Sequence, residues 1–261
     1  MDFEQVLNGL KNGEALYIAM AVVVALIVIV GIFAAGVSIY LAVSYIKYNR
    51  RKNSAGISGN DAARKLLDQN GLNHIKVSTF GSIIFGNSYS HYFNKIRLRR
   101  LTAKKESISS LAMASQKTGL AVLDKENDKD MKTRVMLTPL IYFGPFAFIP
   151  LIVIGVIIDI ITFNTLGITT LITAIVGLLI YAVSFVLSIK VLQTEKKAQA
   201  KAIDMLKENG IATDEEIAMM QDLFRLYNIE YVNNIIIALL EMILRVLQIV
   251  AEMQENNSAN N

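Results

Sequence analysis

Long apolar runs alternate with polar segments along the chain. Three runs cover residues 15–46, 135–163 and 166–192, and a shorter fourth run covers 235–250. About 20 apolar residues are enough for a helix to cross the hydrocarbon core of a bilayer, where no water is available to satisfy an irregular backbone. The pattern therefore predicts three membrane helices, and a fourth helix that either spans the membrane or lies in its interface.

Charged residues around the first run predict its orientation. The residues before it are acidic (Asp2, Glu4 and Glu14), and basic residues follow it at 47 and 50–52. Lys and Arg are enriched on the cytoplasmic side of membrane helices. We expect an external N-terminus and a cytoplasmic main polar domain, in a multi-pass protein of the bacterial plasma membrane. The acidic leader and the length of the run argue against a cleaved signal peptide.

The largest polar segment, 47–134, is strongly basic. It contains 18 Lys and Arg residues against 7 Asp and Glu residues. Such an excess is found in nucleic-acid-binding domains, but no nucleic-acid-binding motif accompanies it here. Cytoplasmic placement and attraction to anionic lipids explain the same excess. We therefore expect the lipid bilayer as a partner, and no nucleic acid. The chain has no cysteine, which excludes disulfides and thiolate metal sites.

Local signals divide this polar segment into a small α+β domain. A helix with serine at its N-cap is expected over 58–70, and short strands are expected at 75–77, 89–93 and 96–100. An amphipathic helix follows over 106–124, because apolar residues recur there at three- and four-residue steps. The predicted fold class is a mainly α membrane protein with three or four membrane helices and a cytoplasmic α+β domain that contains a small sheet.

The same signals give the expected domain boundaries. The second polar stretch carries a capping box, formed by Thr213 and Glu216. In chain order we expect an external N-terminus (1–14), a first membrane helix (15–46), the cytoplasmic domain (47–134), a membrane hairpin of two helices (135–193), cytoplasmic helices (194–230), a fourth membrane or interfacial helix (231–252) and a disordered tail (253–261).

Part of the polar domain resembles a known family. AGISGNDAARKLLDQNGLNHIKV, residues 55–77, is similar to the segment after the first membrane helix in bacterial membrane-bound neutral zinc metallopeptidases of the YugP type. Ser90-His91-Tyr92 stands where that family has an Asp-His-Tyr strand. Further matches follow in the same order, at Arg134, Leu137, Pro139, Gly144, 202–206 and 210–211. The resemblance implies that the cytoplasmic domain is metallopeptidase-like.

The resemblance also implies that the metal site has been lost. In that family a helix before a charged loop carries His-Glu-x-Gly-His, whose histidines bind Zn²⁺ and whose glutamate activates the bound water. With Gly119 on the family's glycine, Gln116 and Leu120 replace the two histidines. Lys117 then replaces the glutamate. Glu195 falls at the third ligand, although its polar neighbours favour a solvated surface position. We expect a degenerate member with no catalytic residue, no metal and no cofactor.

The first functional hypothesis is a pseudopeptidase. Such a protein would bind or scaffold membrane polypeptides, and its partners would be other membrane proteins or a protease complex. Ser90, His91 and Tyr92 would form an edge strand that holds extended segments by β-augmentation. The histidines His74 and His91 are far apart and match no metal-ligand spacing.

Two further hypotheses are compatible with the sequence. A membrane-bound peptidase with residual or unrecognised activity would need a nucleophile, and only the spacing of Ser110 or Ser115 from Lys117 offers one. A channel or transporter component would need charged groups within the membrane. Apart from Lys190 near the end of the third run, the apolar runs contain three residues of this kind: Asp159, Glu241 and Arg245.

Overall fold

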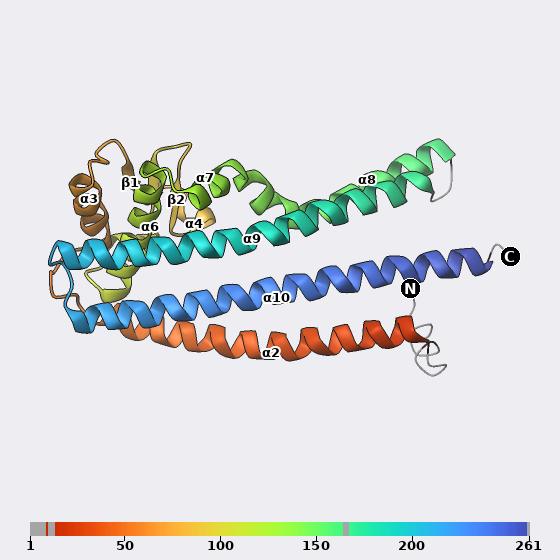
Figure 1. Cartoon of the computed structure of the whole chain (residues 1–261), viewed down its shortest axis with the longest axis horizontal. Coiled ribbons are helices and arrows are strands. Elements are labelled where there is room, and N and C mark those ends of the chain that lie inside the picture. The colour runs from red at the N-terminus through yellow and green to blue at the C-terminus, as the bar shows by residue number, and fades with distance from the viewer. Residues whose placement is uncertain (1–8, 10–13, 164–166, 260–261) are drawn as a thin grey trace. The chain divides into compact units, whose positions relative to one another are not determined.

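The computed structural model describes residues 9, 14–163 and 167–259 (Figure 1). The described chain is mainly helical. Its elements follow in the order α2 (Ala15–Arg50), α3 (Gly59–Gln69), β1 (Lys76–Ser78), α4 (Ser82–Phe85), β2 (Ser88–Ser90), β3 (Lys95–Arg97), α5 (Arg100–Lys104), α6 (Ile108–Lys125), α7 (Lys129–Met136), α8 (Thr138–Phe163), α9 (Ile168–Glu208) and α10 (Asp214–Ala259). Of the expected external segment 1–14, only Gly9 and Glu14 are among the described residues.

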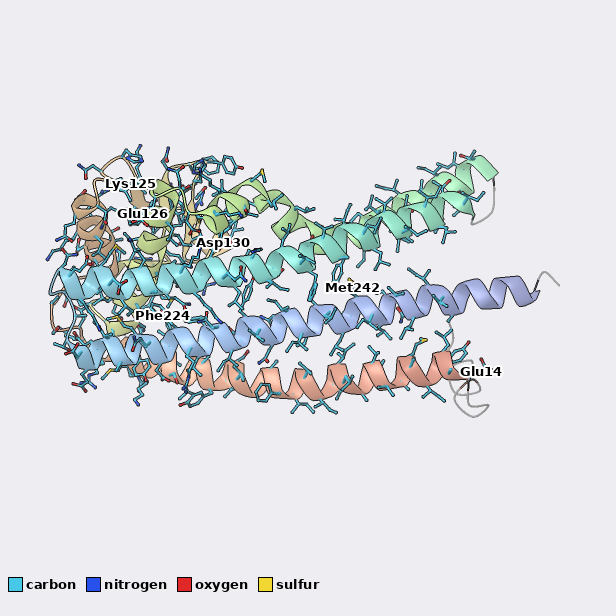
Figure 2. The ribbon with its side chains drawn as sticks, in the orientation of Figure 1. Glu14, Lys125, Glu126, Asp130, Phe224 and Met242 are labelled. Atoms are coloured by element: carbon cyan, nitrogen blue, oxygen red, sulfur yellow. The ribbon has the colours of Figure 1, made fainter. Side chains whose placement is uncertain are left out.

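Two compact units divide the chain. The apolar unit comprises Met1–Gly36, Pro139–Val186 and Val232–Asn261, and the polar unit comprises Val37–Thr138 and Leu187–Tyr231. Figure 2 shows the chemical difference between them: nitrogen and oxygen atoms concentrate around α3, α6 and α7, whereas carbon dominates the side chains along α8. The candidate chemistry of the sequence falls in the polar unit.

Three described helices are long and apolar enough to cross a membrane: α2, α9 and the part of α10 that ends at Ala251. The 36 residues of α2 extend over roughly 54 Å at about 1.5 Å per residue, more than a hydrocarbon core of about 30 Å. This helix must therefore tilt or project into water. The run expected over 135–163 is divided between α7 and α8, and its apolar described stretch, Ile149–Thr162, is shorter.

Helices α9 and α10 are longer than we expected. In place of separate helices over 194–230, α9 continues to Glu208 and α10 runs without a break from Asp214. Gly210 lies between them with a φ of 59°, which glycine adopts at little steric cost. The predicted capping box forms, because Thr213 N–H donates to Glu216 Oε2 at 2.9 Å. The segment 253–261, expected to be disordered, is helical as far as Ala259.

Asp159 is fully buried and caps the start of α9. Its carboxylate accepts hydrogen bonds from the backbone N–H groups of Gly167 (2.9 Å) and Thr170 (2.7 Å), and from the Thr170 hydroxyl at 2.7 Å. The first N–H groups of a helix have no partner within it, so a carboxylate there stabilises the helix. This structural role accounts for the carboxylate of Asp159 within the apolar unit.

The small sheet has the order β1-β3-β2, with β1 parallel and β2 antiparallel to β3. Each strand has only three residues, so the strands predicted at 89–93 and 96–100 were too long. His91 and Tyr92 lie in a turn that follows β2, closed by a 3.0 Å hydrogen bond from Asn94 N–H to His91 O. Of the predicted edge strand 90–92, only Ser90 belongs to a strand.

Helix α6 forms the centre of the polar unit. Every residue from Ile108 to Leu123 is buried, so the expectation of one apolar face was wrong. Ser115 and Thr118 are tolerated there because their hydroxyls bond to the helix backbone. Ser115 Oγ, for example, donates to Leu111 O at 2.8 Å. Helix α3 packs against α6 and contributes core residues such as Leu66.

Candidate functional site

The carboxylate of Glu195, on α9, is the centre of the candidate site. Gln116 Nε2 donates a hydrogen bond to Glu195 Oε2 at 2.8 Å, and Lys117 Nζ lies 3.1 Å from the same oxygen. Arg134 Nη2 pairs with the other oxygen, Oε1, at 2.7 Å. The side chains of Lys117, Glu195 and Arg134 are only 11%, 16% and 17% exposed. We call these four residues the Glu195 centre.

A close crossing of two helices brings the centre together. A Cβ atom on Gly119 would overlap the backbone carbonyl oxygen of Ala198, so α6 and α9 approach each other backbone to backbone at this point. The next residue of α6, Leu120, is buried in a small apolar cluster with Ala198, Leu123 and Met131. The structure thus brings Gln116, Lys117 and Glu195 together, and it gives Leu120 apolar neighbours.

The electrostatics of the centre fix Glu195 in its ionised form. Burial alone would raise the pKa of Glu195, but the positive charges of Lys117 and Arg134, and their hydrogen bonds, lower this pKa to about 2. Two cations thus face one carboxylate in a poorly solvated place. The expectation of a solvated surface position for Glu195 was wrong.

The side chains of the Glu195 centre do not fit a zinc ion. Zinc in proteins is bound by Cys, His, Asp and Glu side chains, and only Glu195 among the four residues is of this kind. A divalent cation would also be repelled by Lys117 and Arg134 at short range. Within residues 9, 14–163 and 167–259, no three His, Asp or Glu side chains gather closely enough to hold a metal ion.

A second polar cluster lies at the sheet. Tyr89 donates its hydroxyl hydrogen to Asp124 Oδ2 at 2.6 Å, and His91 Nδ1 lies 2.6 Å from the same oxygen. Burial, together with the hydrogen bond to Asp124 and the charge of its carboxylate, raises the pKa of Tyr89. Tyr92 donates to the backbone oxygen of Val135 at 3.1 Å. These bonds fix β2 and its turn against α6 and α7.

Neither Ser110 nor Ser115 is paired with Lys117. Ser115 Oγ bonds to the backbone of its own helix, and Ser110 Oγ accepts a 2.9 Å hydrogen bond from Ser107. The ammonium group of Lys117 is paired with Glu195. A lysine that activates a serine must be neutral and must accept the hydroxyl proton. This arrangement removes the spacing argument for a Ser-Lys hydrolase.

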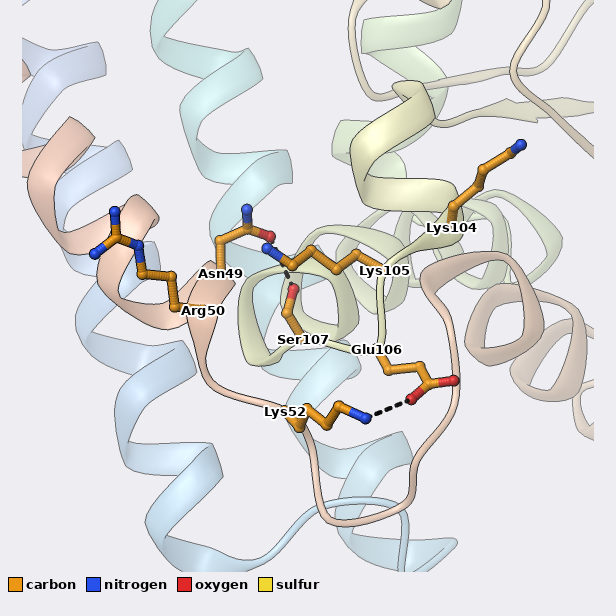
Figure 3. Close-up of a pocket in the computed structure, with 7 residues that line it drawn as sticks. All are labelled: Asn49, Arg50, Lys52, Lys104, Lys105, Glu106 and Ser107. Carbon is orange, nitrogen blue, oxygen red and sulfur yellow. Dashed lines mark hydrogen bonds and ion pairs between the residues drawn. The ribbon is translucent and has the colours of Figure 1, made fainter.

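A pocket of about 230 Å³ lies where α2 ends, beside the connection from α5 to α6. Figure 3 shows Arg50 and Lys104 pointing away from each other, while Lys105 points toward Asn49. Lys52 pairs with Glu106 at 3.7 Å. Because its basic side chains diverge, the pocket does not form a converged anion site.

These features define a class of protein: a membrane protein with long apolar helices, whose polar unit encloses a buried ion-pair centre. Residues 21–251 match the family described as "Putative neutral zinc metallopeptidase", and the chain belongs to this family. The chain is also similar to "Putative membrane protease YugP" of Bacillus subtilis (strain 168), with 23% identity over 207 residues that cover 77% of this chain and 84% of that protein. No solved structure matches the chain. The family predicted from residues 55–77 and the later matches is confirmed.

Sequence reasoning missed two members of these clusters. Arg134 entered only as a matching residue of the family, yet it forms the shortest ion pair of the Glu195 centre. Asp124, which holds Tyr89 and His91, was not singled out. The spacing of residues along the chain predicts neither set of contacts, because the interacting residues come from elements far apart in the sequence.

Proposed function

We propose that this chain is a pseudopeptidase of the bacterial plasma membrane, with its polar unit in the cytoplasm. In this proposal it keeps the framework of the zinc metallopeptidase family and binds membrane polypeptides without cleaving them. One observation carries the proposal: both oxygens of Glu195 are already paired with side chains of the same domain. Two cations therefore already neutralise this carboxylate and would repel a metal ion bound to the same oxygens.

Strand β2 supports the binding role. Within the described residues, β2 is hydrogen-bonded to β3 and to no strand on its other side. An exposed strand edge can pair with an extended polypeptide, whose backbone then supplies most of the affinity. Tyr89 and His91 hold the strand through Asp124, so little ordering cost is expected on binding. We propose other membrane proteins, or a protease complex, as the partners.

Metal content tests the loss of catalysis. Full-length protein, purified in detergent and dialysed against zinc, should contain no stoichiometric zinc and should not cleave unstructured peptides. The triple variant Gln116→His, Lys117→Glu and Leu120→His restores the family's motif and should gain zinc binding. The single variant Gln116→His is the matched control and should not. One zinc ion per wild-type chain, lost on Glu195→Ala, would overturn the proposal.

A crosslinking experiment tests the binding role. A photoreactive amino acid at Ser90, in β2, should capture membrane polypeptides in bacterial membranes. The same amino acid at Lys65, an exposed position on α3, is the control and should capture far less. Ser90→Pro, which removes a backbone donor from β2 and so disturbs the strand, should reduce partner recovery. Unchanged recovery in a folded Ser90→Pro variant would rule out this edge as the binding surface.

A further inference from the structure

The polar unit leaves a group of large apolar side chains in water. Ile83 is 96% exposed, Phe80 and Ile84 are each 81% exposed, and Phe93 and Phe85 are 70% and 60% exposed. We call these five residues the apolar tip. Single exposed hydrophobic residues are ordinary, but a contiguous exposed group marks an interaction surface.

The backbone holds the apolar tip away from the core. Gly81 and Gly86 flank the single turn of α4 with φ values of 80° and 62°, in the left-handed region that favours glycine. Between them, Ser82 is buried and donates its hydroxyl to Thr79 O at 2.7 Å. Ser82 thus anchors the turn, and the next residues, Ile83 and Ile84, project outward.

Cations lie directly beside the apolar tip. Lys95 Nζ is 5.5 Å from the centre of the Phe80 ring. The guanidinium of Arg97 is 5.1 Å from the Phe85 ring and 5.5 Å from the Phe93 ring, within the range of cation–π attraction. The sequence from 69 to 105 contains seven Lys and Arg residues and no Asp or Glu. The apolar tip is therefore surrounded by positively charged residues.

We propose that the apolar tip is a membrane-docking element, which inserts into the interface of a bilayer containing anionic lipids. In this arrangement Lys95 and Arg97 contact the lipid phosphates while the apolar side chains enter the acyl boundary. Aromatic and aliphatic side chains next to Lys and Arg are the composition of interfacial membrane-binding segments.

A bilayer fits these observations better than a polypeptide. Side chains as exposed as Ile83 and Phe80 suit a soft apolar phase, whereas a polypeptide ligand is usually held in a groove or along a strand edge. The polar unit is also joined in sequence to candidate membrane helices, so the chain itself is attached to a bilayer in this proposal. This docking is separate from the proposed binding of polypeptides at β2, and either can fail without the other.

A single fluorescent label tests the proposal. Because the chain has no cysteine, Ile83→Cys can be labelled uniquely with an environment-sensitive dye. The full-length protein is placed in nanodiscs of phosphatidylcholine with or without phosphatidylglycerol. We expect a blue-shifted, severalfold brighter emission with phosphatidylglycerol, and quenching by nitroxide-bearing lipids. Lys65→Cys is the control, and its label should report water in both lipids.

Charge variants complete the test. Lys95→Gln and Arg97→Gln together, in the Ile83→Cys background, should return most of the emission to its value in phosphatidylcholine. Inorganic phosphate in detergent should not produce the blue shift, which distinguishes a lipid headgroup from a free anion. A label that reports water in both bilayers, or one that is shielded only after an unstructured polypeptide is added, would overturn the proposal. Circular dichroism melting of each variant confirms that it is folded.

Discussion

In most proteins charged side chains face water and hydrophobic side chains are buried. The Glu195 centre and the apolar tip both depart from this distribution. The Glu195 centre has largely buried charged side chains inside the polar unit, whereas the apolar tip has hydrophobic side chains exposed to water. The charges are compensated within the domain, because two cations and an amide face one carboxylate. The phenylalanine rings of the apolar tip lie beside Lys95 and Arg97, and the apolar side chains remain 60% exposed or more.

This difference distinguishes a closed site, whose groups are paired within the domain, from an open site, whose groups are exposed and can bind a partner. A buried charge that is paired with opposite charges of its own domain is part of the framework, and removing one partner costs stability. A contiguous exposed apolar group contributes little burial energy to the folded state, so it points to an interaction outside the domain. The comparison predicts that substitutions should damage folding at the first site and leave folding unchanged at the second.

The largest effect is expected from Glu195→Gln. This change leaves Lys117 and Arg134 poorly solvated and without a counter-charge, which costs about 3–5 kcal/mol for a buried pair. The melting temperature, followed by circular dichroism in detergent, should fall accordingly. Lys117→Met in the same background should recover part of the loss. A melting temperature equal to that of the wild type would show that the centre is not closed.

Acidification should weaken the same centre. The folded pKa of Glu195 is about 2, below the ordinary value of 4.5, so its stabilising contribution is present above pH 4.5 and is lost as the pH falls toward 2. At about 1.4 kcal/mol per pKa unit, this contribution is on the order of 3 kcal/mol. Urea unfolding at pH 6 and at pH 3 measures it. Glu195→Gln should show a smaller difference between the two pH values.

The helix crossing should be sensitive to a single methyl group. Gly119→Ala places a Cβ against the backbone of Ala198, and overpacking of this kind costs about 1–3 kcal/mol. Gly36→Ala is the matched control, because no heavy atom lies within 4 Å of its added Cβ, and it should have little effect. Thermal unfolding of both variants measures the difference. Equal melting temperatures would contradict a close crossing.

The smallest effect is expected at the apolar tip. Ile83→Ser should change the free energy of unfolding by less than about 0.5 kcal/mol, because the side chain is almost fully exposed. The matched change inside the domain, Leu120→Ser, should cost several times more, since Leu120 is buried. Denaturant titration of the two variants compares them directly. A large loss for Ile83→Ser would mean that the tip is structural.

Periodic and capping signals were sufficient for much of the fold. The apolar runs predicted long helices, and the helix expected over 58–70 is observed as Gly59–Gln69, with Ser58 accepting a bond from the N–H of Asp61. Strand lengths were less predictable, because the turn after Ser90 depends on the left-handed conformation of Asn94. The burial of α6 on all sides was also missed, since small hydroxyl residues resemble a solvated face in sequence but bond to the backbone when buried.

The candidate site could be predicted only in part. The resemblance to the family placed Gln116, Lys117 and Glu195 in one set, and the structure brings these three together. Arg134 could not be assigned as their partner, because charge pairing between distant elements leaves no periodic trace. The apolar tip was hidden for a different reason: Ile and Phe in a short segment also suit a buried strand.

The close approach at Gly119 has a consequence for how such a protein can change over generations. Residues 116, 117 and 120 are under selection for whatever chemistry the centre performs. They can be substituted once that chemistry is lost. Gly119 is instead constrained by the backbone of Ala198, and this steric constraint is present whether or not a reaction takes place. In a lineage that loses catalysis, the glycine of the motif should therefore be retained after the histidines have been replaced. It is retained because of the helix packing and not because of the reaction.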